Sequence, residues 1–243
     1  PESIEAYPHP RNFAGAEDHL FRNAGNGRFN VVNRAAGLAD TSRAAGRGLG
    51  VVATDYDNDG WSDLYVANDA VPNFLYHNDG DGTFTEIGGV AGVAYGEDGQ
   101  QEAGMGGDAA DYDNDGDMDL VVTNFENEPV SLYRNQGTGF FPHASFATGI
   151  GLVSLRPLSF GIAFVDYDND GYQDLFVANG HVLDKIALFQ GDVGYRQEHQ
   201  LFRNDGAGHF VEQDTTSGSW FADRQISRGT AFGDYDEDGD IDI

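Results

Sequence analysis

The sequence predicts an all-β protein built from repeated four-stranded antiparallel units. The first observation is an acidic loop of nine residues that occurs four times, at 55–63, 111–119, 166–174 and 234–242. The second is a hairpin signature, Leu-Phe/Tyr-Arg/His-Asn followed by two glycines and a phenylalanine, which begins at Leu20, Leu75, Leu132 and Leu201. The third is that the two motifs alternate strictly, with loop starts 56, 55 and 68 residues apart. Repeats of this length with four short strands each predict the blades of a β-propeller.

Two strands flank each acidic loop. A small or apolar run leads into the loop, and it starts near a glycine five residues before the first aspartate: Gly50, Gly106, Gly161 and Gly229. After the loop come apolar runs rich in β-branched and aromatic residues, 64–66, 120–122 and 175–177, which predict short buried strands. Asparagines close these strands: Asn68, Asn124 and Asn179. The acidic loop is therefore predicted to be a hairpin connection.

The second motif predicts another hairpin in each repeat. Its Asn-x-Gly-x-Gly turn, as at Asn78, Gly80 and Gly82, suits the positive φ angles of such turns. Residues 1–19 contain three prolines and no clear period, so we expect an N-terminal arm before repeats that run from 20 to 243. A helix is predicted only at 182–189, inside an insertion at 180–199 that carries the only lysine, Lys185.

The composition of the acidic loop indicates a metal site. Carboxylates stand at positions one, three, five and nine, glycine at six and an aliphatic residue at ten. The predicted metal residues also include position seven of each loop, so that the full set is Asp55, Asp57, Asp59, Trp61, Asp63; Asp111, Asp113, Asp115, Asp117, Asp119; Asp166, Asp168, Asp170, Tyr172, Asp174; and Asp234, Asp236, Asp238, Asp240, Asp242. Calcium is the predicted ion, because it takes six to eight oxygen ligands, whereas magnesium demands a stricter octahedron. We expect about four ions.

Position twelve argues against an EF-hand. That motif has a bidentate glutamate there and lies between helices, whereas this chain has Val66, Val122 and Val177. An acidic surface turn without an ion is the other interpretation, since Asp, Asn and Gly are common turn residues. A plain turn needs no carboxylate at four fixed positions in four copies, and we favour the metal.

The charge balance limits the partners. Asp and Glu number 41 against 13 Lys and Arg, for a net charge of −28, which argues against nucleic acid or an anionic membrane as partner. The chain has no cysteine, so neither disulfides nor thiol chemistry contributes. The sequence shows no membrane span and no signal peptide. Because it starts at Pro1 and stops just after the last loop, we expect a part of a longer protein.

Few residues outside the loops suggest chemistry, and no nucleophile elbow, phosphate loop or zinc motif occurs. His181 is the best polar outlier, although a solvated or hydrogen-bonded loop histidine is the favoured interpretation. Glu97, Asp98 and Glu102 form either another cation site or, as we favour, a solvated acidic loop. The tyrosines at loop position two are expected to pack under the loops: Tyr56, Tyr112, Tyr167 and Tyr235.

With these motifs in hand, the chain resembles the FG-GAP/VCBS repeat proteins, in particular the secreted group related to cartilage acidic protein and ASPIC/UnbV. The stretches that carry the resemblance are 65–69, 111–125 and 178–181, and the similarity extends from about residue 18 to the end. The resemblance implies a β-propeller of about seven blades, structural calcium in the loops and an extracellular or cell-envelope location.

Three functions are compatible with these features. The favoured one is a non-enzymatic binding or adhesion module for a glycan or a protein, because propellers gather equivalent loops on one face. The first alternative is self-assembly into an extracellular layer or filament. The second is a propeller that supports a polysaccharide-active enzyme.

Overall fold

Four antiparallel sheets contain the strands of this computed structural model, which describes residues 8–38, 46–213 and 223–243. A two-stranded hairpin pairs β1 (Phe21–Asn23) with β2 (Phe29–Val31). The first full sheet has the order β3 (Gly48–Thr54), β4 (Asp63–Asn68), β5 (Phe74–Asn78) and β6 (Phe84–Glu86). The second comprises β7 (Gly107–Ala110), β8 (Asp119–Val122) and β9 (Ser131–Tyr133). The third comprises β10 (Ser159–Val165), β11 (Asp174–Asn179), β12 (Gln200–Asn204) and β13 (Phe210–Glu212).

The predicted repeat is therefore confirmed as a meander of strands. Each acidic loop joins the first two strands of its sheet, and the register brings Thr54 opposite Asp63, Ala110 opposite Asp119 and Val165 opposite Asp174. The second sheet has an isolated bridge between Tyr133 and His143 in place of a fourth strand. In the last repeat, the loop is closed by a bridge between Gly233 and Asp242.

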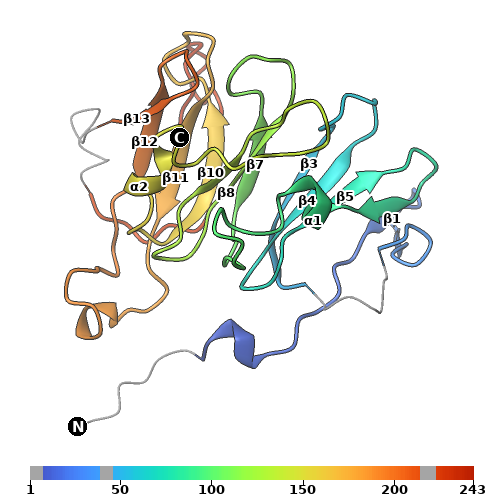
Figure 1. Ribbon diagram of the computed structural model, residues 1–243, viewed down its shortest axis with the longest axis horizontal. Helices are drawn as coiled ribbons and strands as arrows, with labels where there is room; N and C mark the ends of the chain where they lie inside the picture. Colours follow the sequence, from blue (N-terminus) through green and yellow to red (C-terminus); the bar gives the residue numbers. More distant parts are fainter. Residues whose placement is uncertain (1–7, 39–45, 214–222) are drawn as a thin grey trace.

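The sheets stand side by side like propeller blades (Figure 1), and β8 of the second sheet is buried on both faces, between the first and the third sheet. Along β8, Leu120 and Val122 pack against the first sheet, whereas Val121 packs against the third. This division follows from the two-residue period of a strand. Strands β8 and β11 are buried along their whole length, as their continuous apolar runs predict.

Two of the glycines that precede the acidic loops, Gly50 and Gly106, lie where the first strands of neighbouring sheets meet. Strand β7 lies between β3 and β10. A Cβ atom on Gly50 would be 2.4 Å from the carbonyl oxygen of Met105, and one on Gly106 would be 2.1 Å from that of Phe160. Glycine at these two positions thus permits close approach of backbones between the first strands of neighbouring sheets.

An asparagine in each of two hairpins also joins one sheet to the previous one. The Nδ2 atom of Asn135 donates to the carbonyl oxygen of Tyr56 at 2.7 Å, and that of Asn204 donates to the carbonyl oxygen of Tyr112 at 2.8 Å. Both asparagines are fully buried. Each bond therefore connects a hairpin to the acidic loop of the preceding repeat.

The helix predicted at 182–189 is largely wrong, because only the 3-10 turn η2 (Ile186–Leu188) forms there. The described residues also contain η1 (Pro10–Asn12), within the predicted arm, and two short helices between sheets, α1 (Gly88–Ala91) and α2 (Ile150–Val153). A helix of one turn is too short to show a hydrophobic periodicity in the sequence. No helix in the described part of the chain is long and apolar enough to cross a membrane.

The first hairpin does not meet the last repeat. Among the described residues, β1 pairs only with β2, and the segment ending at Ile243 forms only its own bridge. Figure 1 shows β1 and the C-terminus on opposite sides of the molecule. A closed ring of four repeats, with 241–243 beside 20–23, is therefore absent from the described structure.

Candidate metal centre

The acidic loops are named here loop 1 (55–63), loop 2 (111–119), loop 3 (166–174) and loop 4 (234–242). The aspartate at position one organises the backbone of its own loop. In loop 1, Asp55 accepts hydrogen bonds from the amides of Asp59 and Gly60, at 3.0 and 2.9 Å. The same pair of bonds is made by Asp111, Asp166 and Asp234. Positive φ angles at Asn58 (59°) and Gly60 (90°) allow the chain to bend around this carboxylate.

The aspartate at position nine lies under the loop and joins it to the second hairpin. In loop 2, the side chain of Asp119 is fully buried, and it accepts hydrogen bonds from the amides of Tyr112 and Asn135, at 3.1 and 2.7 Å. Loops 1 and 3 have the same arrangement around Asp63 and Asp174. Burial raises the pKa of Asp119 to about 8 and that of Asp174 to about 6. A bound cation would offset this penalty and keep both carboxylates charged.

Basic residues of the second hairpin lie beside the aspartate at position three in loops 1 to 3, and sequence reasoning missed them. In loop 2, Nε of Arg134 lies 2.6 Å from Asp113 and its Nη2 lies 3.2 Å from Asp115. In loop 3, Arg203 is 3.8 Å from Asp168, and in loop 1 His77 takes this place. The signal is visible in the sequence, because a basic residue stands two positions after the leucine in every copy of the hairpin motif.

Carboxylates converge in each of the four loops. Three side chains in each loop have ligand oxygens within 4.8 Å of one another: Asp55, Asp57 and Asp59; Asp111, Asp113 and Asp115; Asp166, Asp168 and Asp174; and Asp234, Asp236 and Asp242. In loop 2, the Oδ1 atom of Asp113 is buried and has no hydrogen-bond partner among the described residues. A buried, unpaired carboxylate oxygen is costly unless a cation binds it. Clustered oxygens of this kind fit a calcium ion.

The side chains at position seven, which are among the predicted metal residues, lie beside the second hairpin or the neighbouring loop. The side chains of Trp61, Asp117 and Tyr172 each lie against the first glycine of the hairpin turn, at Gly80, Gly137 and Gly206. In the last loop, Asp240 accepts a hydrogen bond from Asn169. For Trp61 and Tyr172, the main-chain carbonyl is therefore the group left to contact a metal.

Consecutive loops are connected by the asparagine at position four. The Nδ2 atom of Asn58 donates to the carbonyl oxygen of Gly116 in loop 2, and Asn114 donates to that of Gly171 in loop 3, both at 3.3 Å. Asn169 donates to Asp240 in loop 4 at 2.8 Å. The four loops thus form one hydrogen-bonded row at the same end of the blades.

A family model described as FG-GAP-like repeat matches residues 55–122 and 111–177, which contain loops 1 to 3 and the strands around them. The chain belongs to this family. Among curated proteins, this FG-GAP repeat chain is 28% identical to human cartilage acidic protein 1 over 187 residues. The alignment covers 75% of this chain and 25% of that protein, so the chain spans about a quarter of the relative's length.

A solved structure also shows some similarity to this FG-GAP repeat chain. Its title describes the specific recognition of non-reducing terminal N-acetylglucosamine by a lectin from Agrocybe aegerita. The TM-score is 0.45 at 21% identity, and the similarity covers 85% of this chain and 50% of the lectin chain. A likeness of this degree does not by itself establish a common fold.

The tyrosines at position two are placed as predicted in the first two loops. Tyr56 is buried against Phe141, with ring centroids 5.7 Å apart, and Tyr112 is buried against Phe210 at 5.6 Å. In loop 4, by contrast, Tyr235 is 90% exposed. Each buried tyrosine packs against an aromatic residue of the following repeat.

His181 is a buried structural residue and not a solvated one. Its Nδ1 accepts a hydrogen bond from the amide of Leu183 at 3.0 Å, and its Nε2 lies 3.4 Å from Glu126. The ring packs against Phe125. His181 therefore joins the insertion at 180–199 to the end of the second sheet.

Glu102 is buried at the end of the sheets opposite the acidic loops. It accepts hydrogen bonds from the hydroxyl of Ser131 at 2.7 Å and from Nδ2 of Asn124 at 3.1 Å. Within the described residues, Glu97, Asp98 and Glu102 do not form a group of ligand atoms within 4.8 Å. Burial raises the pKa of Glu102 to about 7, so the protonated carboxyl is the form that burial favours.

Glu102 is expected to make stability depend on pH. Because its pKa is higher in the folded chain than in the unfolded chain, its contribution is full below about pH 4.5 and is lost as pH rises through about 7. The free energy of unfolding of the wild type, relative to Glu102→Gln, should thus fall by up to about 3 kcal/mol from pH 4.5 to pH 8. Urea denaturation of both proteins at several pH values measures the difference, and parallel pH profiles would contradict it.

Substitution of two aspartates of loop 3 is expected to separate the stability of the apo protein from calcium binding. Asp174→Ala removes the acceptor of two amide hydrogen bonds, one buried and one part-buried, so it should lower the free energy of unfolding by about 2–4 kcal/mol even in chelator. Asp168→Ala should abolish one calcium site, leave the other loops able to bind, and change stability little in chelator. Calorimetric titration and urea denaturation check both, and the full wild-type ion count in Asp168→Ala would contradict the assignment.

Proposed function

We propose that this chain is part of a calcium-stabilised β-propeller that binds a glycan or protein partner and does not itself catalyse a reaction. The row of converging carboxylates in loops 1 to 4 supports calcium as the structural ion. Two observations support a larger ring of about seven blades. The full sheets pack on one another. The outer side of β3 is apolar and open, with Leu49 59% and Val51 68% exposed.

The two ends of the blades differ in a way that supports a binding role. Acidic loops and hairpin turns of similar sequence occupy one end, whereas the opposite end carries connections of unequal length, such as 69–73, 87–106 and 180–199. In an array of repeats, such variable connections are where binding specificity resides. We therefore place the binding surface at the end opposite the metal loops.

A cavity at that end is the single observation that carries the proposal. It has a volume of ≈ 550 Å³ and lies between the connection at 97–102 and the segment at 127–129. Carboxylate and amide side chains line it, among them Asp98, Gln100 and Gln101, together with Phe146, which is 46% exposed. Carboxylates and amides supply acceptors and donors for sugar hydroxyls, and an exposed aromatic ring supplies an apolar surface for the face of a sugar. A neutral or basic glycan fits this acidic cavity best.

A glycan array with the calcium-loaded protein tests the proposal, followed by calorimetric titration of the best glycan. Phe146→Ala and Gln101→Ala should weaken binding at least tenfold, because both side chains line the cavity. Phe189→Ala is a matched control, since Phe189 is 52% exposed and is not among the residues that line this cavity. Absence of glycan binding, or equal losses in all three variants, would contradict a glycan site here.

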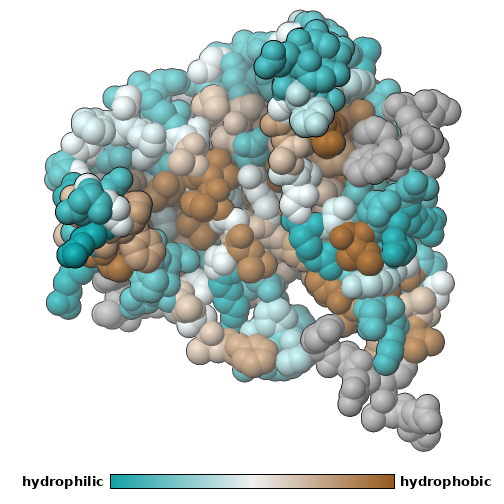
Figure 2. Space-filling view, turned by 180° about the vertical axis from the view of Figure 1, so that it is seen from behind, coloured by the Kyte–Doolittle hydropathy of each residue, from teal (hydrophilic) through white to brown (hydrophobic). Residues whose placement is uncertain are grey.

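Self-assembly is the second candidate, and exposed apolar side chains favour it. Phe21, Phe29 and Val31 of the first hairpin are each at least 55% exposed, as are Leu49 and Val51 of β3. Figure 2 shows hydrophobic residues gathered in separate patches on one face of the molecule. Apolar surface of this kind is typical of contact regions. Sedimentation analysis in calcium distinguishes a monomeric binder from an assembling protein, and turnover of polysaccharides would indicate the enzyme scaffold instead.

An extracellular or cell-envelope location is part of the same proposal. Loops of modest affinity fill reliably where calcium is abundant, and the clustered negative charge needs that counter-charge. Calcium affinities far below micromolar, measured by titration, would remove this argument for an extracellular location.

A further inference from the structure

Loop 1 differs from loops 2 and 3 in the residue that faces its carboxylates. The third residue of the hairpin motif is Arg134 beside loop 2 and Arg203 beside loop 3. In the β1–β2 hairpin it is Arg22. In the repeat of loop 1 the residue is His77, on β5. An arginine at this position can only act as a cation, whereas a neutral histidine is a metal ligand.

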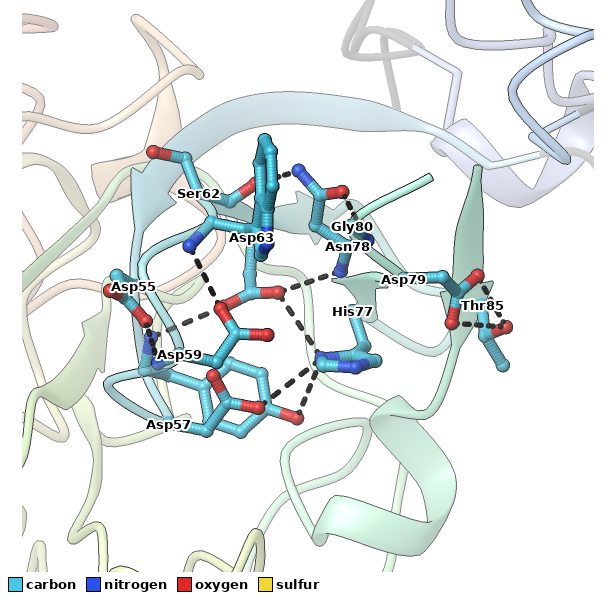
Figure 3. A network of polar contacts seen from close by, with 12 residues as sticks. Asp55, Asp57, Asp59, Ser62, Asp63, His77, Asn78, Asp79, Gly80 and Thr85 are labelled. Carbon is cyan, nitrogen blue, oxygen red and sulfur yellow. Dashed lines mark hydrogen bonds and ion pairs between the residues drawn. The ribbon is translucent and has the colours of Figure 1, made fainter. Parts of the chain in front are cut away.

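His77 directs one ring nitrogen at two aspartates of the loop (Figure 3). Its Nδ1 lies 3.4 Å from Oδ2 of Asp57 and 3.4 Å from Oδ1 of Asp63. The three ligand atoms lie within 4.8 Å of one another. Asp57 is partly exposed and Asp63 is fully buried, so the group opens to solvent on one side.

Neighbouring groups hold His77 and Asp63 in place and leave the carboxylate of Asp63 able to bind a metal ion. The hydroxyl of Tyr56 lies 3.3 Å from Nδ1 of His77, and Oδ1 of Asp63 accepts the amide of Asn78 at 2.7 Å. A carboxylate oxygen has a second lone pair after accepting one hydrogen bond. A nitrogen lone pair aimed at two carboxylate oxygens is repulsive, and this repulsion is relieved by a proton on Nδ1, by a hydrogen bond from the hydroxyl of Tyr56 or by a metal ion between the three ligand atoms.

The ligand set selects the class of metal. Calcium prefers oxygen ligands only, whereas imidazole together with carboxylates suits first-row transition dications such as Zn²⁺ and Co²⁺. Ligand bonds of about 2.1 Å give tetrahedral edges of about 3.4 Å. Both distances from Nδ1, 3.4 Å each, match this edge.

We propose that Asp57, Asp63 and His77 bind a first-row transition dication, which competes with calcium for loop 1. We call this group the His77 site. Because it uses the carboxylates of positions three and nine, the two ions exclude each other in loop 1. Loops 2 and 3 carry a guanidinium at the corresponding place and remain selective for calcium.

Co²⁺ is a suitable probe, because its visible absorption reports nitrogen and oxygen ligands in a site of low coordination number. The wild type, freed of metal by chelator and dialysed, should bind one Co²⁺ per chain, both in the absence and in the presence of moderate calcium. Saturating Co²⁺ should lower the calcium count by one. If no loop binds calcium, the calcium proposal fails but the cobalt count still tests the His77 site.

Three variants decide the assignment. His77→Arg, which copies the other repeats, should weaken Co²⁺ binding at least tenfold and leave the calcium count of loops 2 to 4 unchanged. His209→Arg is the matched control, because His209 is also on a hairpin beside an aspartate, Asp205, at 3.6 Å, but has no second carboxylate ligand among the described residues; its cobalt count should stay at one. Arg134→His should create a second site of the same spectrum in loop 2.

The reverse results would overturn the proposal. No Co²⁺ binding by the wild type, or equal binding by His77→Arg, means that His77 is only a protonated partner of the loop carboxylates. Should His77→Arg fail to fold, His77→Gln and the gain of a site in Arg134→His provide the same comparison. Absence of both the loss and the gain refutes the His77 site.

Discussion

Removal of calcium is expected to lower the melting temperature of this protein by roughly 5–10 °C for each loop that releases its ion. An ion that binds only the folded state, at a hundredfold excess over Kd, adds about 2.7 kcal/mol per site. For a chain of this size, 1 kcal/mol corresponds to about 2–4 °C. The buried aspartates at position nine add to the effect, because their negative charge is unfavourable without a counter-ion. Differential scanning calorimetry in calcium and in chelator measures the shift.

Magnesium and ionic strength are the controls for this experiment. Magnesium at the same concentration should restore little of the lost stability, because the loops do not impose an octahedron. Added sodium chloride should restore only the part due to general repulsion among the 41 acidic residues. An unchanged melting temperature in calcium and in chelator would refute calcium as a structural ion.

Gly106→Ala is expected to destabilise the protein by more than about 4 kcal/mol, whereas Gly229→Ala should change stability by less than about 1 kcal/mol. The two glycines occupy the same position of the repeat, five residues before the acidic loop. A Cβ on Gly106 would lie 2.1 Å from a backbone oxygen of β10, so the first strands of two sheets would have to separate. A Cβ on Gly229 would meet no described atom within 4 Å.

Urea denaturation of the two variants in saturating calcium measures this contrast. Gly50→Ala, whose Cβ would lie 2.4 Å from the carbonyl oxygen of Met105, should resemble Gly106→Ala. Equal and small effects at Gly50, Gly106 and Gly229 would show that the sheets separate at little cost, and would contradict the role assigned to the repeated glycine.

The acidic loops could be located in the sequence with accuracy, since their chemistry is local. Position one binds amides of its own loop, and glycine at position six provides the bend, as in Asp55 and Gly60. The buried strands after the loops were also predictable, because β8 and β11 consist of apolar runs bounded by loop and asparagine. Residues within one short segment carry these features, so no knowledge of distant contacts is needed.

Short elements between the sheets escaped prediction. Helices α1 and α2 have four residues each, and the predicted helix at 182–189 is reduced to η2. Helices of one turn are held by tertiary packing and not by their own propensity. Ile150 of α2, for example, is buried in the core between the second and third sheets.

The sequence by itself determined the repeat, the four carboxylate loops and the two hairpins of each unit, because these depend on spacing within about ten residues. Only the tertiary structure decided that position nine is buried, that Asn135 and Asn204 join neighbouring repeats, and that His77, Arg134 and Arg203 face the loops. These contacts link residues 14 to 92 positions apart, so they arise only when the sheets pack on one another and adjacent strands align. It is this packing that turns the histidine of one hairpin into a neighbour of two loop carboxylates and makes loop 1 unlike loops 2 and 3.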